Sequence, residues 1–295
     1  MIRSWESFLK PGYLENPDAV SDELKEIDGE IPNAPQYLSR ILEEFDKKFQ
    51  SLPVTMKEIR SFLPRFKSKE LFRIYIKNLL VSNIESFSKN LNDLAVAIVQ
   101  ASLIISQRHV SALMGSSWPV NSRGHPYSFA VFALGKFGGQ EMGFASDCNL
   151  FLQTFYLKDL VDVICVHDSN DDSESIVPSA FFSEFVRLFT RCMSDEVPKL
   201  GDAFEVDLRL RPYGSSSLEA VSFRKFKMYY TNSGGAQQFE RQAMIRLRFV
   251  GGDEALGALV EAHRDEFVYS KERIDINVSF FVVMSVPEYE RNLFD

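Results

Sequence analysis

The segment from Tyr127 to Leu150 constrains the fold more than any other part of the chain. It opens with a short, nearly continuous apolar run, Tyr127 to Leu134, which is typical of a buried strand. A turn containing Gly138 and Gly139 follows, and the residues from Ser146 to Phe155 predict a second strand. The segment therefore predicts two strands of a sheet, joined through a glycine-rich turn.

Helical spacing dominates the residues before this segment. Residues Gln36 to Gln50 carry apolar side chains at three- and four-residue steps, with charged side chains on the opposite face, as in an amphipathic helix. The pattern stays helical from Ser68 to about Met114, with Ser82 and Asn83 as a break and a helix cap near its middle. A cluster of Gly, Ser, Pro and Asn over residues 115–126 then indicates a loop. We therefore expect an all-helical domain before this loop.

The residues after the loop mix strand and helix patterns, so the chain as a whole is predicted to be α+β. Alternating side chains predict a third strand from Phe204 to Leu210, whereas Leu160 to Val166 fits either a strand or a helix. Helices are predicted over residues 180–193, 222–230 and 237–249, and after a cap at Asp253. The stretch from Ile274 to Val286 fits either element. We place the domains at residues 1–120 and 121–270, with 271–295 as an extension of unassigned structure.

The charge balance and the cysteines restrict the class of protein. The 295 residues include 33 Lys and Arg against 41 Asp and Glu, a net charge of -8, so we expect no nucleic-acid or membrane surface. Cys148, Cys165 and Cys192 follow no disulfide or zinc pattern. The N-terminal residues lack the apolar core of a secretory signal, and no apolar stretch reaches the length of a spanning helix. We therefore expect a cytoplasmic protein.

Polar side chains on two of the predicted strands are the main candidates for chemistry. Because side chains on a strand alternate between faces, Asp147 and Asn149 point to one side and offer two oxygen ligands to a hard metal ion. Asp207 is expected to share a face with Arg209 and Arg211, whose guanidinium groups suit phosphate. Each of these features, taken alone, more often has a purely structural explanation. Paired glycines occur in turns that bind nothing, and charged strand faces are usually solvated.

Other catalytic chemistry has little support in the sequence. The four histidines are far apart and show no helical or strand pairing, which argues against a histidine metal site. No arrangement of Ser, Cys and His indicates a nucleophile.

Three motifs together resemble a known family. They are GKFGGQEMGFASDCNL at 135–150, VDLRLRPYGSS at 206–216, and Tyr229-Tyr230 followed by FERQAMIRLR at 239–248. Their length, order and spacing are similar to those of the glutamine synthetase adenylyltransferase family over about Tyr127 to Tyr269, with looser similarity over Phe66 to Leu103. The tyrosine pair and Glu240-Arg241 most resemble the N-terminal, deadenylylating half of that family.

The resemblance implies a polymerase-β-type nucleotidyltransferase fold, with a small mixed sheet flanked by helices. It implies addition of AMP to a protein tyrosine, or its phosphorolytic removal, with Mg2+ or Mn2+ as cofactor and ATP, ADP and phosphate as substrates. Glutamine synthetase or another protein substrate is the implied partner, in the regulation of nitrogen metabolism, and a regulatory signalling protein is a further partner that the resemblance allows. Family members carry two such domains in one long chain, whereas this chain has room for one.

Carried over position by position, the resemblance implies site residues of two kinds. Metal ligands, which are also the catalytic residues, are implied at Asp147, Asn149 and Asp207. Contacts to the nucleotide or its phosphates are implied for Gly138, Gly139, Ser146, Arg209, Arg211 and Glu240.

The sequence departs from the family at position 149, where Asn stands in place of Asp. The amide keeps the shape of the side chain but removes one negative charge, and Mg2+ prefers anionic oxygen ligands. Trp is also usual where Phe239 stands, and Gly where Ser217 stands. The change at Asn149 therefore leaves open an alternative, a catalytically silent domain that binds nucleotide or a protein partner, with the helices as the interaction surface.

Overall fold

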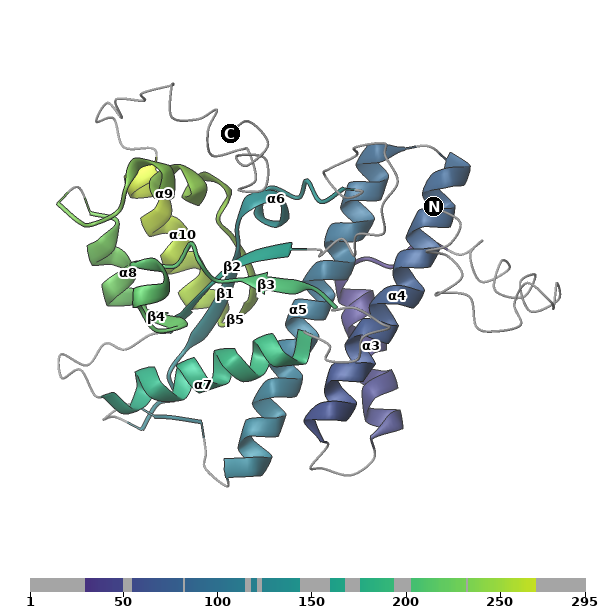
Figure 1. The fold of residues 1–295 in the computed structure, drawn as a ribbon, viewed down its shortest axis with the longest axis horizontal. Helices are drawn as coiled ribbons and strands as arrows, with labels where there is room; N and C mark the ends of the chain where they lie inside the picture. The colour runs from purple at the N-terminus through teal and green to yellow at the C-terminus, as the bar shows by residue number, and fades with distance from the viewer. Residues whose placement is uncertain are drawn as a thin grey trace, which may run out of the picture.

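The computed structural model describes residues 30–49, 55–81, 83–114, 118–120, 124–143, 160–167, 176–193, 203–231 and 233–268. In these residues a small mixed sheet lies between two groups of helices (Figure 1). Helices α3, α4, α5 and α7 pack on one face, and α8 and α10 pack on the other. The fold is therefore α+β with a small mixed sheet, as the sequence predicts.

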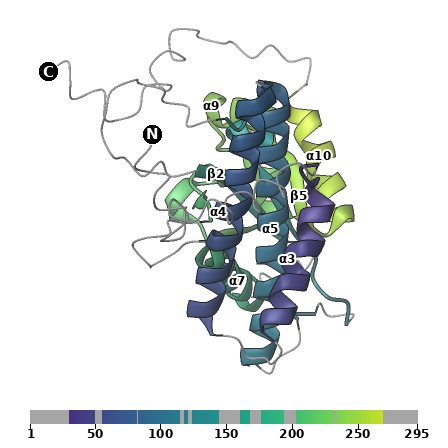
Figure 2. The same ribbon diagram turned by 90° about the vertical axis from the view of Figure 1, so that its right-hand side faces the viewer.

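Among the described residues, three helices precede the sheet and lie side by side (Figure 2). They are α3 (Ala34–Lys48), α4 (Met56–Val81) and α5 (Ile84–Met114). Helix α4 begins before the predicted start at Ser68, because Thr55 and Glu58 cap it: the Thr55 amide donates to Glu58 Oε2 at 2.9 Å. The side chain of Asn83 accepts from the Ser86 amide at 2.9 Å, which confirms the predicted cap of α5.

Three of the later helices form where the sequence predicts them. Helix α7 (Ile176–Met193) covers the predicted helix over residues 180–193. Ser222 caps α8 (Phe223–Tyr229) by accepting from the Lys225 amide, and Asp253 caps α10 (Glu254–Val268) by accepting from the Leu256 amide at 2.8 Å.

The sheet is built around β1 (Phe129–Ala133) and β2 (Leu160–His167), which pair antiparallel. The segment at 160–166 is therefore a strand. On the other side of β1 lies β5 (Arg248–Gly252), also antiparallel. Two short strands, β3 (Glu205–Asp207) and β4 (Ala220–Ser222), run parallel to β2, and each pairs with a different part of it. Both therefore occupy the edge of β2 that faces away from β1.

Two further elements differ from the sequence prediction. The predicted third strand extends to Leu210, whereas β3 ends at Asp207, where a turn begins in which the Arg211 amide donates to Leu208 O at 3.2 Å. The predicted helix over 237–249 divides into α9 (Gln238–Ala243), a short 3-10 turn and β5. Pairing with the open edge of β1 outweighs the local helical spacing there. The predicted strand over 146–155 and the stretch over 274–286 lie outside the described residues.

Side chains of β1 alternate between two hydrophobic cores. Phe129, Val131 and Ala133 pack toward α3, α4, α5 and α7, whereas their neighbours in the strand pack toward α8 and α10. Helix α5 is also hydrogen-bonded to the sheet: Gln100 Nε2 donates to Val250 O of β5 at 2.7 Å. Burial on both faces explains the continuous apolar run of β1. The helices before the sheet share its core, and the domain boundary near residue 120 stays a prediction.

Cys165 and Cys192 are both buried. Burial raises the pKa of Cys165 to about 12 and that of Cys192 to about 11, so both are protonated thiols at neutral pH. Within the described part of the chain, no helix combines the length and the apolar character that crossing a membrane requires.

Candidate functional site

Asp207 ends β3 at the point where the chain leaves the sheet. Its neighbours Phe204 and Val206 pack against the core that α3, α4 and α5 share, so alternation directs Asp207 to the opposite face. The side chain of Asp207 is only 9% exposed, and its Cα lies opposite that of Asp162 in β2. The pairing with β2 therefore fixes the position of this carboxylate.

Arg209 holds the carboxylate of Asp207. Arg209 Nη2 lies 2.6 Å from Asp207 Oδ2, Nε donates to both oxygens at 3.0 and 2.8 Å, and the Arg209 amide donates to Oδ1 at 2.8 Å. Partial burial by itself raises the pKa of Asp207, but the hydrogen bonds from Arg209 and the charges of Arg209 and Arg211 outweigh it and lower that pKa. Asp207 is therefore ionised at neutral pH, as a metal ligand must be.

Arg211 is buried and bonds to the chain around it. Its Nη1 donates to Leu208 O at 2.9 Å, and its Nε and Nη2 donate to Ser217 O at 3.3 and 3.1 Å. These bonds hold together the loop over residues 208–219, which connects β3 to β4. They give Arg211 a structural role in the loop, and its predicted contact with phosphate stays a prediction.

The glycine-rich turn follows β1 and folds as the short helix α6 (Gly135–Gly138). The Gly138 amide donates to Leu134 O at 2.7 Å, and the Gly139 amide donates to Gly135 O at 3.0 Å. A Cβ on Gly138 would lie 2.0 Å from the carbonyl oxygen of Arg246, so this position admits no side chain. The packing of the chain itself therefore requires glycine here, and a role of Gly138 and Gly139 toward phosphate stays a prediction.

The strand register brings the glycine-rich turn and Asp207 to the same end of the sheet. Ala133, the last residue of β1, pairs with Val163 of β2, and the adjacent Asp162 pairs with Asp207. Because neighbouring strands lie about 4.8 Å apart, the end of β1 and Asp207 are separated by about 10 Å across β2. Two elements that the sequence singles out for one site thus lie within reach of a single nucleotide.

Three of the predicted site residues, Ser146, Asp147 and Asn149, lie outside the described residues. The convergence of Asp147 and Asn149 with Asp207 is therefore still a prediction. Across the described ranges, no three His, Cys, Asp or Glu side chains are grouped closely enough to hold a metal ion.

Glu240 lies at the first turn of α9 and is buried. The hydroxyl of Tyr229 lies 2.8 Å from each of its carboxylate oxygens, and the Gln237 amide donates to Oε2 at 2.7 Å. The ring of Tyr213, from the loop after Asp207, lies 4.5 Å from the Tyr229 ring between centroids. Glu240 is thus linked to that loop through two tyrosines.

This pairing makes a testable prediction for Tyr229. Burial, then the hydrogen bond and the charge of Glu240, raise the pKa of Tyr229 to about 12. We expect Glu240→Gln to lower this pKa toward the ordinary value of 10.0, because the variant removes the negative charge beside the phenol. An ultraviolet absorbance titration measures the change, and Tyr229→Phe identifies the phenol concerned.

The sign of the effect on stability follows from the raised pKa. The contribution of the protonated Tyr229 hydroxyl to folding stability is fully present below pH 10 and is lost as the pH rises through about 12. An identical titration curve for Glu240→Gln and the natural protein would contradict the pairing.

Arg248 is a residue of this region that the sequence reasoning missed. Its Nη2 donates to Phe137 O at 2.7 Å, and its Nε donates to Gly138 O at 3.1 Å, so it contacts the glycine-rich turn directly. The only local pattern that could have pointed to Arg248 is the alternation of apolar residues and arginine at the end of the third motif, Ile-Arg-Leu-Arg.

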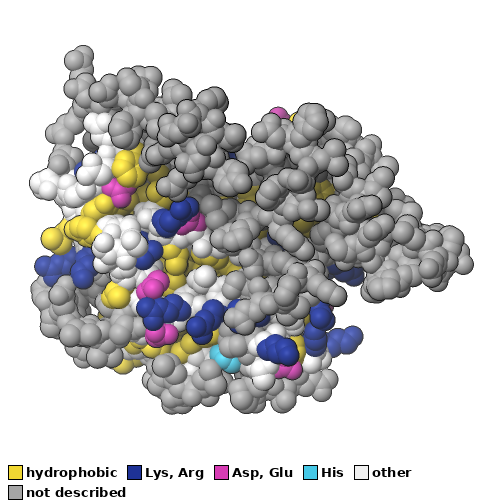
Figure 3. Space-filling model, viewed as in Figure 1, with side chains coloured by type: hydrophobic (Ala, Val, Ile, Leu, Met, Phe, Trp, Pro, Cys, Tyr) yellow, Lys and Arg dark blue, Asp and Glu magenta, His cyan; other side chains and the backbone are white. Residues whose placement is uncertain are grey.

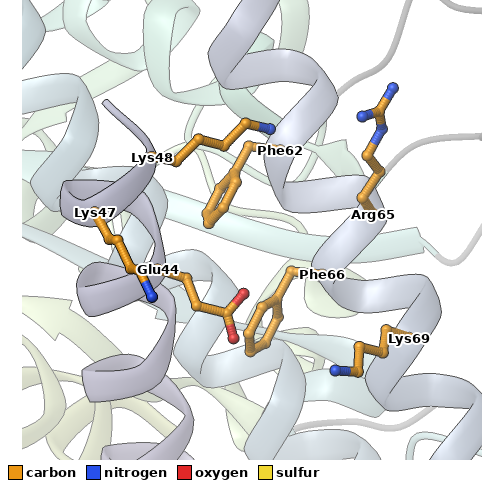
Figure 4. Close-up of a pocket in the computed structure, with 7 residues that line it drawn as sticks. All are labelled: Glu44, Lys47, Lys48, Phe62, Arg65, Phe66 and Lys69. Carbon is orange, nitrogen blue, oxygen red and sulfur yellow. The ribbon is translucent and has the colours of Figure 1, made fainter. Parts of the chain in front are cut away.

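A hollow between α3 and α4 lies apart from these residues (Figure 4). It has a volume of about 530 Å3 and is lined by Glu44, Lys47, Lys48, Phe62, Arg65, Phe66 and Lys69. Lys48 Nζ lies 5.7 Å from the centroid of the Phe62 ring. None of the candidate site residues lines this hollow. Elsewhere, on the face drawn in Figure 3, visible Lys and Arg side chains are interspersed with Asp and Glu.

Comparison with known proteins places the chain in a family. The sequence model for glutamate-ammonia ligase adenylyltransferase matches residues 11–263. The chain is 32% identical to the bifunctional glutamine synthetase adenylyltransferase/adenylyl-removing enzyme of Ralstonia nicotianae, over 66% of this chain and 18% of that protein. Proteins of the same name from Pseudomonas putida and Shewanella woodyi are each 30% identical, over 72% and 92% of this chain. The matched parts cover 21% and 26% of those two proteins, so the chain spans about a fifth to a quarter of the curated relatives it matches. Together with the mixed sheet, the glycine-rich turn and Asp207, these matches show that the chain belongs to the glutamate-ammonia ligase adenylyltransferase family.

Proposed function

We propose that this chain is a metal-dependent nucleotidyltransferase with a polymerase-β-type fold, which adds AMP to a tyrosine of glutamine synthetase or removes it by phosphorolysis. The observation that carries the proposal is the common position of the glycine-rich turn and Asp207 at one end of a mixed sheet. The relatives are named for adding and removing adenylyl groups on glutamine synthetase, which supports the choice of reaction and partner. We place the reaction in the cytoplasm.

The donor chemistry at Asp207 fits Mg2+ or Mn2+. Its carboxylate is ionised and held at a strand end, and hard divalent ions prefer such oxygen ligands. In the proposed site Asp147 and Asp207 hold the ion, with Asn149 as a neutral third ligand. A bound ion would stabilise the negative charge of the transferred phosphoryl group.

The reaction exchanges one phosphorus–oxygen bond for another. To add AMP, the tyrosine hydroxyl gives up its proton, its oxygen bonds to the α-phosphorus of ATP, and the bond from that phosphorus to pyrophosphate breaks. To remove AMP, an oxygen of inorganic phosphate bonds to the phosphorus of the tyrosine-linked AMP and the bond from that phosphorus to the tyrosine oxygen breaks. ADP is released as the product, and the tyrosine oxygen takes up a proton. Arg209 suits the phosphate oxygens because its side chain is 82% exposed beside Asp207 and a planar guanidinium offers several donors to such oxygens.

The experiment that tests the proposal is the substitution Asn149→Asp. It restores a negative ligand with almost no change in volume, so we expect tighter metal binding and at least tenfold faster transfer or phosphorolysis, which corresponds to about 1.4 kcal/mol of barrier. Both proteins are assayed with Mn2+, ATP, phosphate, and adenylylated or unmodified glutamine synthetase. Asn83→Asp is the matched control, because it makes the same chemical change at the cap of α5, where Asp caps as well as Asn.

Different results reject different parts of the proposal. If the natural protein and Asn149→Asp are equally active, the chain is an enzyme, but Asn149 does not limit its rate. If both proteins bind nucleotide and neither is active, the chain is not the enzyme proposed. If neither binds nucleotide or metal, the whole proposal fails.

A further inference from the structure

Two arginines at the start of β5 contact the glycine-rich turn: Arg246, which lies just before the strand, and Arg248, which is its first residue. Arg248 donates to Phe137 O at 2.7 Å and to Gly138 O at 3.1 Å, so its two nitrogens span consecutive carbonyl groups. Arg246 Nη1 lies 2.7 Å from Glu141 Oε2 at the far end of the turn. The carbonyl oxygen of Arg246 also lies against Gly138, where it leaves no room for a Cβ. We refer to Arg246 and Arg248 as the arginine clamp.

The surroundings of Arg248 favour arginine over lysine. Its Cζ lies 5.4 Å from the centroid of the buried Phe137 ring, and its Nη2 lies 3.4 Å from Asn92 Oδ1 of α5. Phe137 O also accepts from the Gln140 amide at 3.3 Å, and a planar guanidinium supplies several donors in a fixed fork that spans the two carbonyl groups. A lysine ammonium carries its three donors on one nitrogen and cannot present the same fork. Arg248 therefore joins β5, α5 and the turn in one set of bonds.

We infer that the arginine clamp positions the glycine-rich turn for nucleotide, with Arg248 as the principal positioning residue. The clamp acts through the turn and makes no contact with the reacting atoms. Its effect on nucleotide rests on the proposed function, whereas its effect on the turn rests on the contacts described above. Because Arg248 also contacts Asn92, a shift of α5 would reach the nucleotide site through this side chain.

The test compares Arg248→Lys with the control Arg264→Lys. Arg264 Nη1 donates to the carbonyl of Leu247, which lies between the two clamp residues, but from α10 rather than from the turn. Two quantities are measured in each full-length variant: amide hydrogen exchange across residues 138–141, and the Kd for ATP with Mn2+. We expect Arg248→Lys to speed exchange in the turn and to weaken ATP binding, each about tenfold, with β1 amides unchanged. Arg264→Lys should change neither.

Each outcome decides one part of the inference. Unchanged exchange in the turn of Arg248→Lys would overturn the clamp, as would equal acceleration in Arg264→Lys. Faster exchange with unchanged ATP affinity would overturn the positioning role. A natural protein that binds neither ATP nor ADP would overturn the proposed function, while hydrogen exchange would still decide whether the clamp exists.

A second variant covers the case in which Arg248→Lys does not fold. Arg246→Gln removes a pair whose side chains are 44% and 56% exposed, so it leaves the core intact. Because exposed ion pairs contribute little, we expect exchange at Glu141 to rise about twofold to threefold. Exchange at the natural rate in this variant would count against the clamp.

Discussion

Asp207→Asn is expected to slow adenylyl transfer or phosphorolysis at least a hundredfold. The substitution keeps the volume of the side chain but removes the charge that a divalent ion in the proposed site would need from it. Asn149 is already neutral, so Asp147 would remain as the only anionic ligand among the three proposed metal residues. Loss of one electrostatic contact to the transferred group commonly costs about 10²- to 10³-fold in rate. Initial rates with Mn2+, nucleotide and glutamine synthetase measure the loss.

Glu219→Gln is the matched control for this prediction. Glu219 is also an acidic residue paired with an arginine, since its Oε1 lies 3.2 Å from Arg187 Nε, and it lies at the other end of the same loop. We expect this variant to keep the natural rate and to bind Mn2+ normally. If Asp207→Asn is as active as Glu219→Gln, Asp207 is not a metal ligand of the reaction.

Gly138→Ala is expected to destabilise the protein by more than about 3 kcal/mol. The added Cβ would lie 2.0 Å from Arg246 O and 2.9 Å from Ala133 O, and both contacts are with backbone atoms that no side-chain rotation can move. Relief requires β5 or the turn to shift, which also breaks the bonds from Arg248. Urea unfolding followed by circular dichroism measures the loss of stability.

Gly143→Ala supplies the comparison, because a Cβ at Gly143 has nothing within 4 Å. This variant should unfold within about 0.5 kcal/mol of the natural protein. If Gly138→Ala is as stable as Gly143→Ala, the carbonyl oxygen of Arg246 does not pack closely against Gly138 in solution.

Local patterns were sufficient to predict most of the helices and the central strand. Asn83, Ser222 and Asp253 cap the helices that follow them because a cap depends on residues three positions away. The apolar run of β1 predicts a buried strand because both of its faces are covered. Local pattern also placed the glycine-rich turn directly after the first strand and Asp207 on a later strand, but it did not predict that β3 ends at Asp207. That these residues form one site stays a prediction.

Contacts between distant residues explain what the sequence did not predict. β5 forms because it pairs with β1, although the sequence predicts its first two residues as the end of a helix. β3 stops at Asp207 because the chain turns there, with Arg211 bonded to carbonyl groups of the loop. Arg248 and Gly138 are 110 residues apart in the chain, and no local pattern reveals that they meet.

The shared edge of β2 gives the loop over residues 208–219 freedom to change length. Asp207 lies opposite Asp162 and Ala220 lies opposite Cys165, so the loop leaves and rejoins the sheet at points about 10 Å apart. Doubling the length of such a loop adds only about 0.6 kcal/mol of closure entropy. An insertion after Ser217, beyond the part of the loop that Arg211 holds together, is therefore expected to cost little stability, while the pairing with β2 keeps Asp207 in register.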